Sequence, residues 1–406
     1  MEKSSVPVFL TAGFRFFFLA AGIFGAAAMA FWIFWLTIHH LGGAFVSAPM
    51  AMAPHLWHAH EMIYGYTVAV MAGFFLTAVP NWTGAPSARA AYISFTGVIW
   101  LAGRSAIWFS AHLDPLLVAA IDLAFIPLLM QKIGGNLLKK TQARNLVFLG
   151  LLIAMLTGNI LMHLEWIGWI DDGTFAGARL GIFTSAAMIV IIGGRVVPGF
   201  TRNALNRRGH VGAMPSNHPI VDRVAIASSV LTAVLSAFAS DSILFAGLCL
   251  VAGAANIARV AGWRGQLTVR EPILWVLHAA FAMVGLSYLG FATSHFLAYP
   301  TEVGALHLMA IGAVGTMTLA MMTRASLGHT GRQLVVARPI AGAYVAVLLA
   351  AAIRGFGPDL IGYYPALYAS GCLWIAAFCV YVALYLPILG RDRQPRANVG
   401  AAESAT

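Results

Sequence analysis

Twelve long runs of apolar residues follow one another along the chain, separated by short polar stretches rich in turn-forming residues. An α-helix needs about 20 predominantly apolar residues to cross a bilayer. Main-chain groups in lipid must be hydrogen-bonded within their own segment, so each run is expected to be an α-helix. The predicted spans are residues 14–38, 56–80, 91–112, 115–132, 144–165, 175–202, 220–240, 243–261, 271–294, 302–324, 334–354 and 362–389. The pattern therefore predicts an all-α, polytopic integral membrane protein.

The polar stretches between these runs are too short for a soluble domain. We therefore predict a single transmembrane domain over residues 1–390, followed by a disordered cytoplasmic tail over residues 391–406. The first run, "FRFFFLAAGIFGAAAMAFWIFWL", is longer than the apolar core of about 7–15 residues that a cleaved signal carries. It is expected to stay in the membrane as an anchor.

A short motif recurs at the ends of spans that lie four apart. The second span ends in "AVPNWTG" and the sixth in "RVVPGFTRN", so Val-Pro-x-x-Thr occurs twice, and the tenth ends in "MMTRASLG" without the proline. Repeats at a fixed period indicate repeated structural units. The spacing favours three four-helix units in a pseudo-threefold arrangement.

Composition and charge agree with a membrane protein and exclude a nucleic-acid partner. Only 9% of the residues are charged and mean hydropathy is +0.82, whereas soluble domains carry about a quarter charged residues. The net charge of +10 comes from 24 Lys and Arg, of which 20 fall at the termini and in the loops on one side. Cytoplasmic loops are enriched in Lys and Arg, so both termini are predicted to be cytoplasmic.

Three cysteines lie within predicted spans, and no Cys-x-x-Cys-His motif occurs. Covalently attached c-type haem and a disulfide framework are therefore excluded. A haem in this chain would have to be a non-covalently bound haem b.

The segment "PHLWHAHEMIYGY" carries ionisable residues into the second span. Residues three apart on a helix share a face, so His55, His58 and Glu61 are expected to line one side. His60 is rotated by about 200° from His58 and faces away, with Tyr64 one turn further on. Ionisable groups inside a membrane are costly and commonly functional, which favours a metal or cofactor site here.

Two further spans carry a histidine, His278 in the ninth and His307 in the tenth. At 1.5 Å per residue, His307 lies at the depth of His58, whereas His278 lies about 10–15 Å deeper. We expect His58 and His307 to share a metal or haem site. Arg195, inside the sixth span, either pairs with a haem propionate or extends to the interface and binds main-chain carbonyls.

A second possible copper site lies in the loop after the first span, where His39 and His40 occur with Met50 and Met52. Thioether and imidazole groups suit copper, especially Cu(I). Packing of the two methionines is the alternative.

Four blocks of the sequence together closely resemble the NnrS family: "WHAHEMIYGY…AGFFLTAVPNWTG", "GGRVVPGFTRNAL", "EPILWVLH" and "HLMAIGAVGTMTLAMMTRASLGHTGR". The resemblance implies a bacterial inner-membrane protein of about twelve helices, with haem and copper, linked to nitric oxide metabolism and relief of nitrosative stress. It carries cofactor or metal roles onto a limited set of residues: His58, His60, Glu61, Arg195, His278, His307 and Arg324.

Two functions remain open. As an enzyme, the protein would bind nitric oxide at a haem–metal site and reduce it to nitrous oxide, with Glu61 and Tyr64 as catalytic residues and an unknown electron donor. Alternatively, it senses or transports nitric oxide, haem or copper without turnover.

Overall fold

The computed structural model describes residues 6–44, 48–139 and 143–395, and within these residues it contains helices and no strand. Twelve helical spans are long and apolar enough to cross a membrane, in the predicted order. The main helices are α1 (Gly13–His40), α2 (Pro54–His60), η2 (Glu61–Thr67), α3 (Val68–Thr83), α4 (Ala90–Trp108), α5 (Pro115–Leu123), α6 (Phe125–Lys139), α7 (Ala143–Ile167), α8 (Gly173–Arg207), α9 (Pro219–Phe238), α10 (Ile243–Gly262), α11 (Pro272–Leu297), α12 (Glu302–His307), η5 (Leu308–Gly315), α13 (Thr316–His329), α14 (Arg338–Ile361) and α15 (Tyr363–Leu389); short 3-10 turns are η1 (Val8–Leu10), η3 (Ser110–His112) and η4 (Gly265–Thr268). The prediction of an all-α membrane protein is confirmed.

Local sequence sets where several helices begin and end. Asp114 accepts hydrogen bonds from the main-chain N–H groups of Leu116 and Leu117 and so caps α5, which then starts with a proline. At the other end of a span, Gly84 has φ of +68° and terminates α3, a conformation that a side chain would strain.

Two spans are interrupted by a π-helical segment shortly after they enter the bundle. In the second span, η2 joins α2 to α3, and in the tenth span, η5 joins α12 to α13. In both, a threonine hydroxyl at the end of the segment donates to the carbonyl five residues earlier: Thr67 to Met62 at 2.9 Å and Thr316 to Ile311 at 3.4 Å. π-Helical turns re-aim side chains and are frequent at functional sites.

Burial of the spans repeats with a period of four. Of the residues in their most apolar part, 78% are buried in the second span (α2–η2–α3) and in the sixth (α8), and 72% in the tenth (α12–η5–α13). The other spans reach 33–44%, apart from α11 at 67%. Three spans four apart thus form the centre of the molecule.

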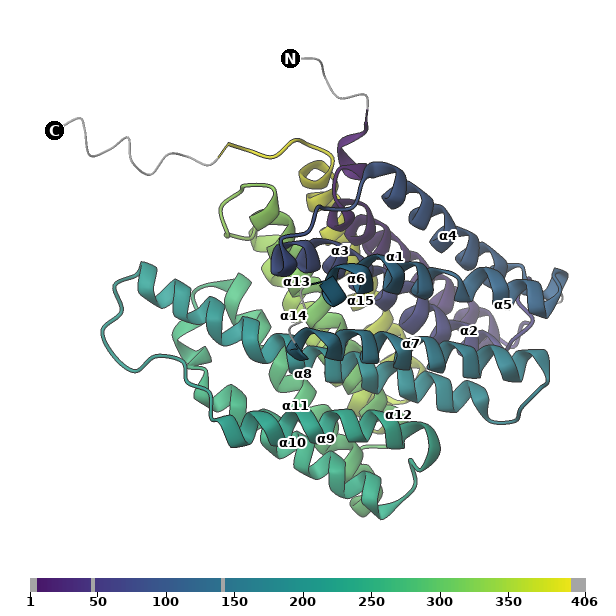
Figure 1. Cartoon of the computed structure of the whole chain (residues 1–406). Helices are drawn as coiled ribbons and strands as arrows, with labels where there is room; N and C mark the ends of the chain where they lie inside the picture. The colour runs from purple at the N-terminus through teal and green to yellow at the C-terminus, as the bar shows by residue number, and fades with distance from the viewer. Residues whose placement is uncertain (1–5, 45–47, 140–142, 396–406) are drawn as a thin grey trace.

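Packing between the spans also repeats with a period of four. The first helix of each predicted unit packs against the last span of another unit: α1 against α15, α7 against α5 and α6, and α11 against α10. These contacts agree with the predicted pseudo-threefold arrangement of three four-span units. In Figure 1, the purple and blue first unit and the teal and green second unit form separate layers.

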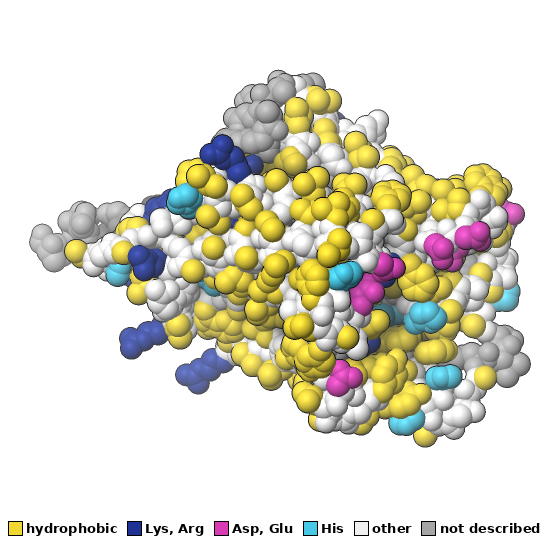
Figure 2. All heavy atoms as spheres, turned by 90° about the horizontal axis from the view of Figure 1, so that it is seen from below, with side chains coloured by type: hydrophobic (Ala, Val, Ile, Leu, Met, Phe, Trp, Pro, Cys, Tyr) yellow, Lys and Arg dark blue, Asp and Glu magenta, His cyan; other side chains and the backbone are white. Residues whose placement is uncertain are grey.

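Both termini lie on the same side of the molecule (Figure 1). Nη1 of Arg15, at the start of α1, donates to the main-chain oxygens of Leu389 and Arg391 at 2.7 Å, which joins the beginning of the first span to the end of the last. We call this end of the bundle the terminal end. In Figure 2, Lys and Arg gather toward one end of the visible face, and Asp and Glu toward the other.

The predicted disordered tail begins with residues that have defined contacts. The main-chain N–H of Gln394 donates to the carbonyl of Thr330 at 2.9 Å. Residues 396–406 lie outside the described residues, so the prediction of disorder there stays a prediction.

Candidate functional site

A network of polar side chains is buried where the second, third, fourth and fifth spans meet. Its members all have exposed fractions of 8% or less: His60, Glu61, Arg104, Asp122, Asn159 and His163. The four spans that supply them are packed against one another, so the network is enclosed by protein. Ionisable groups at such depth require partners within the protein.

Arg104 joins the two carboxylates of the network. Its Nη1 donates to Oε1 of Glu61 at 2.7 Å, and its Nη2 donates to Oδ1 of Asp122. Glu61 Oε1 also accepts a hydrogen bond from Nδ1–H of His60 at 2.9 Å. Both buried acids are therefore paired, as a low-dielectric interior demands.

The other oxygen of Asp122 faces two histidines. Its Oδ2 lies 3.2 Å from Nε2 of His60 and 3.0 Å from Nε2 of His163. Candidate ligand atoms of the three residues all lie within 4.8 Å of one another. Atoms that share a metal ion at about 2.0–2.2 Å lie about 3 Å apart, so this spacing suits one bound ion.

His60 has more acceptors around it than a neutral imidazole can satisfy. Its Nδ1 faces Glu61, while its Nε2 faces Asp122 and, at 2.9 Å, Oδ1 of Asn159. A neutral ring carries one N–H only. The His60 ring therefore needs either a second proton or a metal ion at Nε2 to satisfy the acceptors on both of its sides. In the second case Glu61 holds the Nδ1–H and fixes the ligand, as carboxylates do beside metal-bound histidines.

Two aromatic residues, Trp166 and Tyr64, pack against the histidines of the network. The Trp166 ring lies 5.2 Å from the rings of both His60 and His163, and its buried Nε1 has no hydrogen-bond partner among the described residues. Tyr64 lies 5.4 Å from His60, as expected one turn further on, and its hydroxyl donates to the carbonyl of Gly177 at 2.6 Å. Tyr64 thus binds the second span to α8.

His58 lies apart from this network, beside Trp32 of α1. Its ring stacks on that indole with centroids 4.9 Å apart at 17°, and its buried Nδ1 has no hydrogen-bond partner among the described residues. His307 donates Nδ1–H to the carbonyl of Val303 at 2.7 Å, which leaves Nε2 as the open lone pair. The charge of Arg354 acts on both imidazoles; whether they share one site stays a prediction.

The expected face shared by His55, His58 and Glu61 is corrected by the structure. Glu61 is bound to His60 and Arg104, because the guanidinium compensates its charge. His55 is exposed at the start of α2. The second span therefore presents His58 to one group of residues and His60 with Glu61 to another.

His278 has a local role in packing. Its Nε2 donates to the hydroxyl of Thr201 at 2.8 Å, and that hydroxyl donates to the carbonyl of Val197 at 3.0 Å. A Cβ at Gly265 would lie 2.9 Å from its Nδ1, which is buried and has no hydrogen-bond partner among the described residues, so a cofactor role for His278 stays a prediction. Its hydrogen bond to Thr201 links α11 to α8.

The two arginines assigned to cofactor binding occupy different environments. Arg195 is exposed on the surface of α8. Arg324 is buried and lies over the Phe200 ring at 3.7 Å. It follows His307 by 17 residues of one helical span, about 25 Å, which is too far for the two to hold one haem.

The loop residues considered for copper are engaged in packing. Met50 and Met52 are buried in an apolar cluster with Trp57. His39 stacks on Trp35, and His40 stacks on Tyr364 with ring centroids 3.7 Å apart.

Four members of the network were not singled out by the sequence analysis: Arg104, Asp122, Asn159 and His163. Asp122 carried the clearest signal, because it is the single acidic residue in the apolar run "PLLVAAIDLAFIPLLM". An acid there needs a buried partner, and Arg104 and His163 in neighbouring spans were the available ones.

Residues 8–393, nearly the whole chain, match the profile of a family described as NnrS protein. No curated protein is significantly similar to the chain.

Proposed function

Because the chain belongs to the NnrS family, we propose that this membrane protein of nitric oxide metabolism holds a redox metal at His60, Asp122 and His163 and reduces nitric oxide to nitrous oxide. The buried environment of these residues supports the proposal, since Nε2 of His60 faces oxygens of Asp122 and Asn159, and a metal ion at Nε2 is one of the two ways to satisfy them. Two imidazoles and one carboxylate suit copper or iron. Localisation in the bacterial inner membrane, with the bilayer as the surrounding phase, belongs to the same proposal.

Haem b is assigned to the other face of the second span, where it would be held by His58 and His307. The donor set suits a haem: Nδ1 of His58 has no hydrogen-bond partner among the described residues, Nε2 of His307 is open, and Arg354 would supply a cation for a propionate. When bound there, haem supplies one-electron redox chemistry. His58 and His60 would then serve two centres from opposite sides of one helix.

Side chains of the protein would supply the protons that the reaction consumes. Forming nitrous oxide and water from two molecules of nitric oxide consumes two electrons and two protons. Glu61, whose Oε1 lies 2.9 Å from His60 Nδ1, is the carboxyl group beside the site that would hold a proton for the reaction. Arg104 holds Glu61 in place. The electrons must come from a one-electron donor whose identity is open.

Nitrous oxide formation tests the proposal. Purified protein, loaded with metal and haem and reduced, is given nitric oxide without oxygen, and nitrous oxide is measured by gas chromatography. We expect one nitrous oxide per two nitric oxide over many turnovers. Stoichiometric binding without nitrous oxide would contradict reduction and leave a protein that senses or transports nitric oxide, haem or copper.

A further inference from the structure

Between the three central spans, a hollow opens at the terminal end and narrows toward the middle of the bundle. Its wide part has a volume of about 680 Å³ and its narrow part about 80 Å³. Phe18, Phe74, Val196 and Met321 line both parts, so the two parts adjoin.

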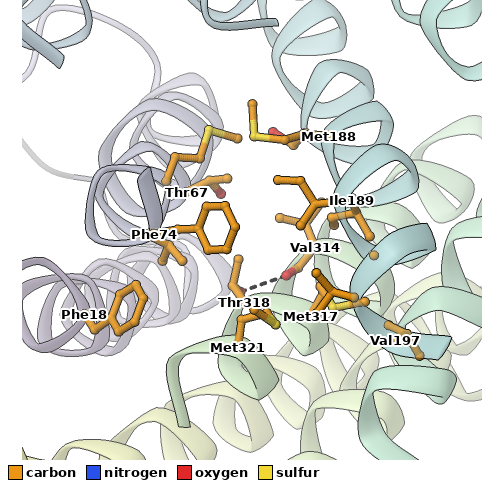
Figure 3. A pocket seen from close by; sticks show the side chains of 16 residues that line it. Phe18, Thr67, Phe74, Met188, Ile189, Val197, Val314, Met317, Thr318 and Met321 are labelled. Atoms are coloured by element: carbon orange, nitrogen blue, oxygen red, sulfur yellow. Dashed lines mark hydrogen bonds between the residues drawn. The ribbon is translucent and has the colours of Figure 1, made fainter. Parts of the chain in front are cut away.

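The narrow part offers only apolar surface. Figure 3 shows Phe74, Ile189, Val314 and Met317 pointing toward it from the second, sixth and tenth spans. The hydroxyl of Thr318, which also lines it, is hydrogen-bonded to its own helix at Val314, 2.7 Å away (Figure 3). A hydrocarbon group fits this pocket better than water, which needs free polar partners.

The wide part contains a buried guanidinium without a counterion. Arg324 is 8% exposed and stacks on Phe200, which leaves the N–H groups at the edge of its plane free. Among the described residues it has neither an ion pair nor a hydrogen bond, and the charged group that acts on it most is another cation, Arg207. An arginine at such depth calls for an anion.

The charge of the opening adds to that of Arg324. Arg393 supplies this charge; it lines the same part of the hollow, at the terminal end. Enrichment of cations in cytoplasmic loops explains exposed lysines and arginines. It does not explain the buried guanidinium of Arg324, which packs against Phe200 of the sixth span.

We propose that this hollow binds an amphipathic organic anion, with its anionic head on Arg324 and its apolar body in the narrow pocket. Such a molecule can come from the bilayer, as a lipid with an anionic head group, or from the aqueous phase, as a carboxylate with an apolar chain. Arginine binds carboxylate and phosphate oxygens in pairs, so both sources share the recognition chemistry.

Native mass spectrometry of the full-length protein in detergent tests this site. Dodecanoate is the probe, with dodecanol as the neutral chain and acetate as the head group alone. We expect one bound dodecanoate, and weaker binding of dodecanol and acetate. Arg324→Gln should weaken dodecanoate binding at least about tenfold, the loss typical of a charge-assisted pair.

Two further variants keep the result interpretable. Arg324→Lys keeps the charge and should retain most of the affinity, and Arg338→Gln, which removes an exposed arginine at the start of α14, should change nothing. Displacement of dodecanoate by phosphatidic acid would assign the site to a lipid; failure to displace it would assign it to a soluble carboxylate. Equal binding by Arg324→Gln and the unchanged protein, or equal binding of dodecanol, would overturn the proposal.

Discussion

His60 is the residue on which the account depends, because both of its ring nitrogens are in use. Nδ1 is held by Glu61 at 2.9 Å, and Nε2 lies 2.9–3.2 Å from oxygens of Asn159 and Asp122. A metal ion at Nε2 would replace contacts with these acceptors by coordination bonds of about 2.0–2.1 Å.

Asp122→Asn should remove most of the bound metal. The substitution keeps the shape of the side chain but removes the negative charge that faces His60 and His163. Loss of a metal ligand should lower metal occupancy at least about tenfold, since even removing an outer partner of a ligand costs about 10–100-fold in affinity. Metal per protein is measured by inductively coupled plasma mass spectrometry. Asp241→Asn, in an exposed turn, is the control and should retain the metal.

Glu61→Gln should separate metal binding from turnover. The amide oxygen can still accept the Nδ1–H of His60, so the metal should stay, but the amide cannot relay a proton. We expect metal content near that of the unchanged protein and a rate of nitrous oxide formation lower by about 10²-fold or more, the usual size of general acid–base effects. Turnover at the unchanged rate would remove Glu61 from the mechanism. His210→Ala, in an exposed loop, is the matched control for the assay.

The sequence predicted the histidines of this region better than their partners. "WHAHE" placed His60 away from His58 because helical geometry fixes that angle. It could not show that Glu61 would turn to His60, since the choice depends on Arg104, 43 residues later in another span. The pairing of His58 with His307 followed from depth alone and stays a prediction.

Close contact between α7 and α8 positions the fifth span against the second. A Cβ at Gly177 would lie 2.2 Å from the carbonyl oxygen of Gly158, and the Gly177 carbonyl accepts the Tyr64 hydroxyl. Small residues at such crossings let the backbones of two membrane helices approach. The same helix α7 carries His163, which binds Asp122 of α5.

Gly177→Val should therefore force α7 and α8 apart. Overpacking of this kind costs about 1–3 kcal/mol, and the unfolding temperature of the purified protein should fall by about 1–4 °C. Gly150→Ala is the control, because no atom lies within 4 Å of a Cβ placed there. Circular dichroism during heating measures both, and equal unfolding temperatures would show that the crossing tolerates a side chain.

At the scale of the whole molecule, an even number of spans puts both termini on one side, and positive charge identifies that side. Twenty of the 24 Lys and Arg fall there in the predicted topology. A fusion of alkaline phosphatase to the C-terminus should be inactive, whereas a green fluorescent protein fusion should be fluorescent, because the tail is predicted to be cytoplasmic. An active phosphatase fusion would reverse the orientation.

The order and number of spans were predictable because hydrophobicity and length decide them. The predicted 115–132 and the observed Pro115–Leu138 begin at the same residue, for example. The central position of the second, sixth and tenth spans was indicated only by the recurrence of Val-Pro-x-x-Thr. Their π-helical segments and the hollow between them could not be predicted, because both depend on packing between distant parts of the chain.

The central claim is a metal ion among His60, Asp122 and His163. Anomalous diffraction from crystals of the metal-loaded protein, recorded above and below the copper and iron absorption edges, locates such an ion directly. We predict a peak within bonding distance, about 2.0–2.2 Å, of Nε2 of both histidines and of an Asp122 carboxylate oxygen. Metal-loaded crystals with no anomalous peak between these three residues would contradict the account.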